Sequence, residues 1–287
     1  MGTVIPLKKE INNSYLELKN LVGDKLNSVS NVINTKLTSE INLISKMTNH
    51  HLNSGGKRIR PLLTLAAAKL CKYKNGNRDI NLAACIELIH SATLLHDDVI
   101  DNSDLRRGSK TTNSIWGNQS SILVGDYLFS RCFEMMVEDG SSEVLKLLSS
   151  TSSTIAQGEV LQLEHKGEID LLEETYFNII NMKTAALFAA ATRVGACIGN
   201  KNKKEKDALE SYGKNLGLAF QIADDALDYF STSTILGKEI GKDFYEGKTT
   251  LPLIIIFQKA NSEEKNFLAE IFKKEKRNED DFSETLA

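Results

Sequence analysis

Only three prolines, Pro6, Pro61 and Pro252, occur in the 287-residue chain, and apolar residues recur at helical spacing through most of it. Strand-like alternation of apolar and polar residues is scarce. An apolar stripe at i, i+3 and i+4 spacing is the pattern of a helix with one buried face. The chain is therefore expected to be all-α. The expected helices cover residues 10–22, 27–52, 61–73, 80–101, 119–137, 142–164, 171–199, 203–230, 250–260 and 263–276.

The pentad Asp-Asp-x-x-Asp occurs twice, at residues 97–101 and 224–228. On a helix the first and fifth residues of a pentad project from one face, where like charges repel unless a cation compensates them. An isolated pentad is ordinarily a solvated acidic turn, but both copies lie in apolar stretches, where charges are rarely buried unpaired. Opposed helices would offer these carboxylates to Mg²⁺, which prefers a few carboxylates together with substrate phosphates. The pentads therefore predict a magnesium-dependent diphosphate site.

Composition narrows the classes of function. Hydrophobic residues make up 41% of the chain and charged residues 25%, as in an ordinary globular protein. The formal net charge of -3 gives no basic field that would recruit nucleic acid. The sequence contains neither a signal segment nor an apolar run long enough to cross a membrane, so a cytoplasmic protein is expected. No linker or short-period repeat divides residues 1–287, which predicts one domain.

Three groups of basic and polar residues are candidates for completing a diphosphate site. In Gly-Gly-Lys-Arg-Ile-Arg-Pro (55–61) the glycines allow backbone to approach an anion, and a helix then begins. Arg106 and Arg107 can fork onto phosphate oxygens. The third group is dispersed and comprises Lys183, Thr184, Gln221, Lys238 and Lys248. Singly, none is diagnostic, because solvated loops have the same composition.

Together with the pentads, these residues belong to an ordered set of motifs. The segments are Gly-Gly-Lys-Arg-Ile-Arg-Pro (55–61), His90 with Leu-Leu-His-Asp-Asp-Val (94–99), Asp-Leu-Arg-Arg-Gly (104–108), Val-Gly-Asp-Tyr-Leu (124–128), Gln-Gly-Glu (157–159), Lys-Thr-Ala (183–185), Gln-Ile-Ala-Asp-Asp-Ala-Leu-Asp (221–228) and Glu-Gly-Lys-Thr-Thr-Leu-Pro (246–252). The set resembles the trans-type isoprenyl diphosphate synthases, and among them the bacterial long-chain, octaprenyl-like polyprenyl diphosphate synthases. The resemblance covers about residues 40 to 260.

The resemblance implies a single helical bundle of the isoprenoid synthase type with a central active-site cavity. It implies a prenyltransferase that condenses isopentenyl diphosphate with an allylic diphosphate, expected to be farnesyl diphosphate, into a long-chain trans-polyprenyl diphosphate. The pentads would hold Mg²⁺ ions that bridge the allylic diphosphate. The metal ligands it implies are Asp97, Asp98, Asp101, Asp224, Asp225 and Asp228.

The same resemblance assigns the remaining site residues. Catalysis would rest on Asp97, Asp101, Asp224, Lys183 and Arg106. The allylic diphosphate would meet Arg106, Lys183, Thr184, Gln221, Lys238 and Lys248, and isopentenyl diphosphate would meet Lys57, Arg60, His90 and Arg107. A histidine on a helix face is more often a satisfied core residue. His90 is nevertheless placed in the site because it aligns with Asp97, seven positions on.

Product length is expected to depend on side chains upstream of Asp97. In the resembled family a bulky aromatic residue four or five positions before this aspartate stops chain growth early, whereas this chain has Thr93 and Ala92 there. A long product is therefore expected, with a cavity floor formed by Phe133 or by Met135 and Met136.

Two alternatives are weighed against this interpretation. A class I terpene cyclase also ionises an allylic diphosphate, but its second metal motif is normally not another Asp-Asp-x-x-Asp. A non-catalytic regulatory subunit typically lacks a pentad, and both are present here. The chain is shorter than long-chain members usually are, so C-terminal helices are expected to be lacking. The family pattern also predicts a homodimer formed through residues 119–137, with Leu123, Phe129 and Phe133 either at the interface or in the core, and a product passed to the membrane.

Overall fold

The computed structural model describes residues 8–74, 76–230 and 240–286, and almost all of their regular structure is helical. The N-terminal half contains α1 (Lys8–Lys36), α2 (Asn42–Asn53), α3 (Ile59–Leu70), α4 (Arg78–Ile100), the hairpin β1 (Leu105–Arg106) and β2 (Ser109–Lys110), α5 (Thr112–Trp116) and α6 (Asn118–Asp139). The remaining elements are α7 (Ser142–Glu164), α8 (Glu173–Ile180), the π-helix η1 (Asn181–Ala185), α9 (Ala186–Ile198), α10 (Lys203–Phe230), α12 (Lys242–Glu246), α13 (Leu251–Lys259), α14 (Ser262–Phe272) and α15 (Glu279–Leu286). The expected all-α fold is confirmed.

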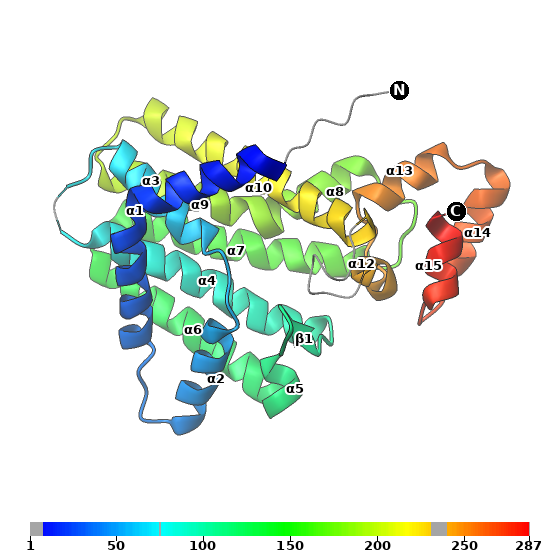
Figure 1. The fold of residues 1–287 in the computed structure, drawn as a ribbon, viewed down its shortest axis with the longest axis horizontal. Coiled ribbons are helices and arrows are strands. Elements are labelled where there is room, and N and C mark those ends of the chain that lie inside the picture. The colour runs from blue at the N-terminus through cyan, green and yellow to red at the C-terminus, as the bar shows by residue number, and fades with distance from the viewer. Residues whose placement is uncertain (1–7, 75, 231–239, 287) are drawn as a thin grey trace.

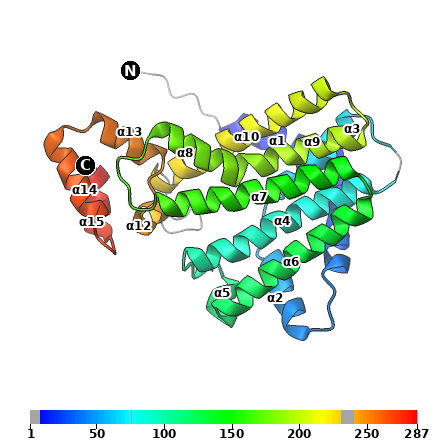
Figure 2. The ribbon, with the colours of Figure 1, turned by 180° about the vertical axis from the view of Figure 1, so that it is seen from behind.

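Two long helices organise the bundle. The α4 helix packs against α1, α3 and α6, and α9 packs against α3, α7 and α10, so the two acidic pentads lie on different helices around a shared core (Figure 1). The last helices, α14 and α15, lie at one end of the molecule, on the side where α4 and α10 end (Figures 1 and 2). This arrangement brings the C-terminal ends of α4 and α10 towards the α12–α13 segment.

The apolar residues of the described chain form three buried clusters. The largest surrounds α4 and α9 and includes Leu82, Ile86, Ile89 and Phe188. Burying one such side chain stabilises the fold by roughly 1.5–3 kcal/mol. The second joins α12, α13 and α14, and the third joins α8 to α13. The site described below lies where these clusters meet.

Close helix packing at α9 depends on glycine. A Cβ atom on Gly195 would lie 2.5 Å from the backbone nitrogen of Ala68 on α3. A Cβ on Gly217 of α10 would lie 2.7 Å from Cα of Ala185. Because real Cβ atoms do not approach so closely, these two glycines set the distance of α9 and η1 from their neighbours.

The structure differs from the expected helices in several places. A single helix, α1, replaces the expected break after residue 22, because Val22, Leu26, Val29 and Ile33 form one continuous buried stripe. The break falls instead before α2. The expected helix 171–199 is divided by η1, and residues 105–110 form a short hairpin that was not expected. Residues 279–286, where no helix was expected, form α15.

Candidate diphosphate and metal site

The first pentad lies at the C-terminal end of α4, where Asp97 and Asp101 are one turn apart. Burial raises the pKa of Asp97; Asp101 adds to the shift, and Lys183 opposes it. Burial also disfavours ionisation of Asp101, but the ammonium of Lys248, 2.8 Å from its Oδ2 atom, outweighs burial and lowers the pKa of Asp101. The two carboxylates thus occupy a buried site whose charge is balanced by lysines from distant segments.

Asp98 points the other way, towards the hairpin. Nε and Nη2 of Arg106 donate to its Oδ1 atom at 2.9 and 2.7 Å, and Nε also reaches Oδ2 at 3.1 Å. The Asp98 side chain is 2% exposed. The guanidinium of Arg106 therefore occupies both oxygens of a predicted metal ligand, and Asp98 fixes the orientation of Arg106.

The second pentad lies near the end of α10. Asp224 is half-buried, whereas Asp225 and Asp228 are buried. Tyr176 donates to Oδ2 of Asp225 at 2.6 Å, and the Gln221 amide donates to Oδ1 at 2.7 Å. The backbone N–H of Asp243 donates to Oδ2 of Asp228 at 3.0 Å. Asp225 and Asp228 therefore make hydrogen bonds within the protein.

Several carboxyl groups around the second pentad have shifted pKa values. Burial raises the pKa of Asp225 to about 6, although the hydrogen bonds from Tyr176 and Gln221 oppose the shift. Burial, together with the charge of Asp228, raises the pKa of Asp243 to about 8. Both shifts arise mainly because burial disfavours the charged form of a carboxyl group, and neighbouring carboxylates add to them.

Lys183 and Thr184 both lie in η1, and their side chains reach different helices. The Lys183 ammonium donates to Oε2 of Glu159 at 2.6 Å and to Oε1 of Gln162 at 2.9 Å, both on α7. The Thr184 hydroxyl donates to Oε1 of Gln221 on α10 at 2.8 Å. A single π turn within a helix is frequently found at functional sites.

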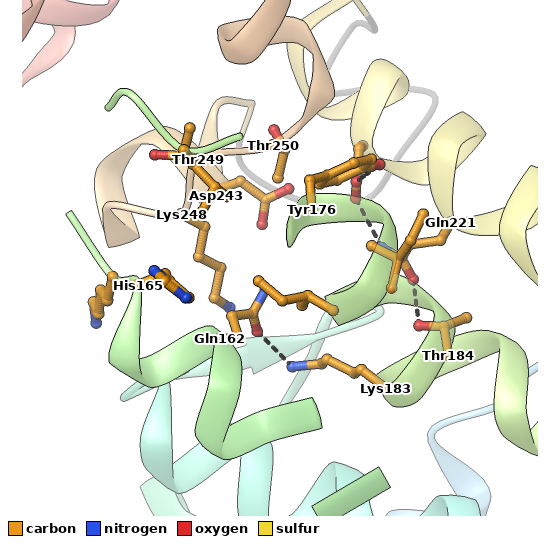
Figure 3. A pocket seen from close by; sticks show the side chains of 15 residues that line it. Gln162, His165, Tyr176, Lys183, Thr184, Gln221, Asp243, Lys248, Thr249 and Thr250 are labelled. Atoms are coloured by element: carbon orange, nitrogen blue, oxygen red, sulfur yellow. Dashed lines mark hydrogen bonds between the residues drawn. The ribbon is translucent and has the colours of Figure 1, made fainter. Parts of the chain in front are cut away.

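A cavity of about 90 Å³ lies between α7, α8, η1, α10 and the α12–α13 segment (Figure 3). Lys183 and Lys248 enter it from different elements, and dashed lines in the figure mark the bonds from Lys183 to Gln162 and from Thr184 to Gln221. The lining residues are Gln162, His165, Lys166, Leu171, Tyr176, Ile179, Ile180, Lys183, Thr184, Gln221, Asp225, Asp243, Lys248, Thr249 and Thr250. The cavity therefore combines an apolar wall with both cations and carboxylates.

The first two predicted basic groups lie against each other. Arg107, in the hairpin, donates to the carbonyl of Gly55, and its guanidinium packs so closely on Gly56 that a Cβ there would lie 2.6 Å from Nη1. Arg60 is half-buried, its Cζ atom lies 4.5 Å from the ring centroid of Phe188, and desolvation lowers its pKa to about 10. The Gly55–Gly56 loop and the double-arginine motif are thus brought together, as predicted for one anion site.

Three further residues complete this basic pocket. Burial, with Arg60 next, lowers the pKa of His90 well below its usual value. Burial, followed by Arg106 and Arg107, lowers the pKa of His51 to about 4. Burial also raises the pKa of Glu87, which the arginines oppose. Neutral imidazoles beside arginines leave the pocket's positive charge on guanidinium groups.

Lys57 stands apart from these contacts. Lys57 is exposed, and its carbonyl accepts a hydrogen bond from Tyr15. Lys238 lies outside the described residues.

The residues predicted to set product length fall in two different environments. Ala92 is completely buried on α4, and the hydroxyl of neighbouring Thr93 donates to the carbonyl of His90 at 2.8 Å. Phe133 is 47% exposed on α6, so within the protomer it does not form the predicted cavity floor. Met135 and Met136 are buried.

The predicted magnesium site can be judged by its available oxygens. Within the described ranges, no three His, Cys, Asp or Glu side chains converge as an all-protein metal cage. Asp97 and Asp101 nevertheless fit Mg²⁺, because this ion is usually bound by one or two carboxylates with waters and substrate phosphates. Asp98 and Asp225 fit less well, since both of their oxygens are already hydrogen-bonded.

Sequence reasoning did not single out five residues of this site: His51, Glu87, Glu159, Tyr176 and Asp243. Glu159 lies in the Gln-Gly-Glu motif, which gave a positional signal without a role. The other four lie in segments with no local signature, and only the packing of α2, α4, α8 and α12 brings them to the site.

Comparisons with known proteins match the family that the sequence motifs resemble. The polyprenyl synthetase family model matches residues 41–287. The octaprenyl diphosphate synthase of Escherichia coli (strain K12) is 47% identical over 203 residues, which are 71% of this chain and 62% of that protein. The short chain isoprenyl diphosphate synthase of Methanothermobacter thermautotrophicus is 39% identical over 230 residues, 79% of this chain and 70% of that protein.

A solved structure gives the same result for the fold. The crystal structure of a polyprenyl synthase from Caulobacter crescentus CB15, complexed with calcium and isoprenyl diphosphate, superposes with a TM-score of 0.91. It is 43% identical and covers 94% of this chain and 82% of that one. This chain belongs to the polyprenyl synthetase family. In the alignment with the Escherichia coli protein it spans less than two thirds of that relative's length.

The lengths and apolar character of the described helices can be compared with those of membrane-spanning helices. Among the described helices, none combines the length and apolar character needed to span a bilayer.

Proposed function

We propose that this chain is a polyprenyl diphosphate synthase that condenses isopentenyl diphosphate with an allylic diphosphate. The observation that carries the proposal is the presence of two cationic regions that are built by different segments of the chain. One contains Lys183 and Lys248 near Asp97 and Asp101, and the other contains Arg60 and Arg107 beside the Gly55–Gly56 loop. Two diphosphate substrates need two such regions.

The reaction begins with the allylic substrate. Its C–O bond breaks, and the electron pair leaves on the diphosphate. Bound magnesium would supply Lewis-acid stabilisation of that leaving group. Lys183, Lys248 and Arg106 add fixed positive charge, and Asp97 and Asp101 are the carboxylates that best fit the metal, with Asp224 completing the set from α10.

The second substrate then forms the new bond. Arg60, Arg107 and His90, with Lys57 at the exposed edge, would hold the isopentenyl diphosphate. The π electrons of its double bond form a carbon–carbon bond to the allylic cation, and a proton is lost to the departed diphosphate. The products are a longer allylic diphosphate and inorganic diphosphate, so the cycle can repeat.

A long product is part of the proposal. Ala92 and Thr93 place no aromatic side chain upstream of Asp97, and Met135 and Met136 are candidates for the floor. Relatives with both octaprenyl and short-chain names resemble this chain, so length has to be measured directly.

We also propose that the protein acts as a cytoplasmic homodimer. Ile122, Leu123, Phe133 and Val137 of α6 are 42%, 67%, 47% and 66% exposed, an unusual apolar content for a solvated helix surface. Burial of this face against a second copy would explain it. Sedimentation should give a dimer mass, and Leu123→Arg should reduce it to that of a monomer. A monomeric parent chain would contradict this part of the proposal.

The activity is tested by incubating the purified chain with farnesyl diphosphate, labelled isopentenyl diphosphate and Mg²⁺, followed by chromatography of the dephosphorylated products. A ladder ending in a long polyprenol is expected. A chelator or Asp97→Ala should abolish it, whereas Asp104→Asn, at an exposed position of the neighbouring loop, should not. Product formation only after a second polypeptide is added would favour the regulatory-subunit alternative, and a cyclised hydrocarbon would favour the terpene cyclase.

A further inference from the structure

The Gln-Gly-Glu motif at residues 157–159 has no role in the mechanism above, yet it lies directly against η1. A Cβ atom on Gly158 would lie 2.7 Å from the backbone nitrogen of Lys183 and 2.8 Å from Cβ of Met182. Only glycine at this position allows α7 to approach η1 so closely. The next residue, Glu159, is therefore held beside the side chain of Lys183.

Glu159 binds Lys183 through one oxygen only. Its Oε2 atom accepts from the Lys183 ammonium at 2.6 Å, and its Oε1 atom is buried without a hydrogen-bond partner. The side chains of Glu159 and Lys183 are 18% and 22% exposed. Gln162, one turn further along α7, accepts a second hydrogen bond from the same ammonium at 2.9 Å. A flexible lysine is thus fixed by two acceptors from one helix.

The π-helical turn explains why this contact is possible. Lys183 is turned towards α7, while Thr184, the next residue, is turned towards Gln221 on α10. Neighbouring residues of η1 therefore connect two helices on opposite sides. The position of the Lys183 ammonium is therefore fixed by hydrogen bonds to side chains of α7.

From these contacts we infer that Glu159 is a positioning residue, which aims the ammonium of Lys183 at the leaving diphosphate of the allylic substrate. The inference rests on the proposed function. A fixed cation stabilises charge that develops in the transition state without reorganising at the moment of reaction. A mobile lysine can still attract a bound diphosphate, but it stabilises the transition state less well.

This role predicts a separation of kcat from binding. Glu159→Ala should lower kcat by at least about tenfold, because Lys183 loses its main acceptor. The affinity for diphosphate should stay the same or rise, because a carboxylate beside the anion site has been removed. A merely structural role would weaken both. These two expectations are tested by measuring kcat from product formation and by measuring diphosphate affinity in a calorimeter. In the calorimeter the protein is titrated with inorganic diphosphate in the presence of Mg²⁺.

Conservative variants separate the hydrogen bond from the charge. Glu159→Gln retains an oxygen acceptor and should keep kcat within about threefold of the parent chain. Glu159→Asp keeps the charge but withdraws the acceptor by one methylene, so it should resemble the alanine variant. Glu164→Gln, at an exposed position of the same helix, is the matched control and should change neither measurement.

A double-mutant cycle with Lys183→Ala tests whether the effect of Glu159 on kcat is transmitted through Lys183. If Glu159 acts through Lys183, its substitution should have little further effect on kcat once Lys183 is absent. An undiminished effect in that background, or an unchanged kcat in folded Glu159→Ala, would overturn the inference. If the parent chain binds diphosphate without turnover, the proposed function fails, and the inference is judged from calorimetry alone. A change in affinity caused by Glu159→Ala that disappears with Lys183→Ala would then support it, and one that persists would overturn it.

Discussion

Nζ of Lys248 lies 2.8 Å from Oδ2 of Asp101, although the two residues are 147 positions apart in the chain. The same ammonium lies 2.7 Å from Oε2 of Glu246, and all three side chains are no more than 15% exposed. One lysine therefore forms ion pairs with two carboxylates and connects the end of α4 to the segment after α12.

Lys248→Met should lower the unfolding free energy by about 3 kcal/mol, because it removes the cation that two largely buried carboxylates share. Adding Mg²⁺ should recover part of this loss by binding to the folded state. Urea denaturation with and without Mg²⁺ measures both effects. Lys273→Met is the control, since Lys273 and its partner Glu270 are both 70% exposed. Equal losses in the two variants would contradict the prediction.

Asp98→Asn should destabilise the fold by about 3 kcal/mol, because it leaves the partly buried guanidinium of Arg106 without a charged partner. The loss should be accompanied by lower turnover, since Arg106 would no longer be held in one orientation. Denaturation and product assays on the same preparation measure the two effects. Asp104→Asn should remain within about 0.5 kcal/mol of the parent chain.

His51 should contribute a loss of stability between pH 7 and pH 5, which the raised pKa values of Asp225 and Asp243 oppose. Burial lowers its pKa to about 4 in the folded chain, whereas an unfolded histidine titrates near 6.5. Between these values the unfolded chain binds the extra proton at His51, so this group alone favours unfolding by about 2 kcal/mol from pH 7 to pH 5. His51→Gln should reduce this pH dependence, measured by urea denaturation at both pH values. The same slope in the variant would exclude His51 as its source.

Gly195→Ala should destabilise the protein by about 1–3 kcal/mol, since the added Cβ would lie 2.5 Å from the backbone of Ala68. Gly23→Ala makes the same chemical change within α1, where no atom lies within 4 Å of the new Cβ. It should stabilise by about 0.5–1 kcal/mol, because alanine favours helix. Melting temperatures should therefore move in opposite directions.

Ala92→Phe tests the proposed product tunnel. Ala92 is fully buried on α4, so a phenylalanine there would extend into whatever space the growing chain occupies. The product distribution should shift to shorter chains, as measured by chromatography. Leu70→Phe, at a position 70% exposed, should leave the distribution unchanged. An unchanged distribution in the Ala92 variant would remove Ala92 from the tunnel wall.

The sequence was sufficient to predict the all-α fold and the placement of each pentad near a helix end, because helical periodicity and carboxylate spacing are local properties. The α10 helix, for example, was expected at 203–230 and occupies that range. The merging of two expected helices into α1 was not predictable from Gly23 alone, since a glycine within a helix is tolerated when neighbouring residues pack.

The different roles of the aspartates within each pentad could not be predicted from the sequence. Asp97 and Asp98 are adjacent in sequence and identical in chemistry, and only the position of Arg106 makes one a support for a guanidinium. Asp225 is distinguished from Asp224 in the same way, by Tyr176. Phe133 looked suitable for a cavity floor because it is large and apolar, but the rotation of α6 turns it outward. Such choices depend on contacts between distant segments.

The π-helical turn η1 contains one residue more than an α-helical turn would, and this limits how the segment can change in length. One residue corresponds to about 100° of rotation along a helix, so α8 and α9 are out of phase by that amount relative to an uninterrupted α-helix. Each side of the junction packs in its own cluster, α8 with α13 and α9 with α3 and α4. Deleting one residue would therefore turn either packed face, or Lys183 and Thr184, away from its partners. Natural variation in this segment should consist of substitutions rather than insertions or deletions.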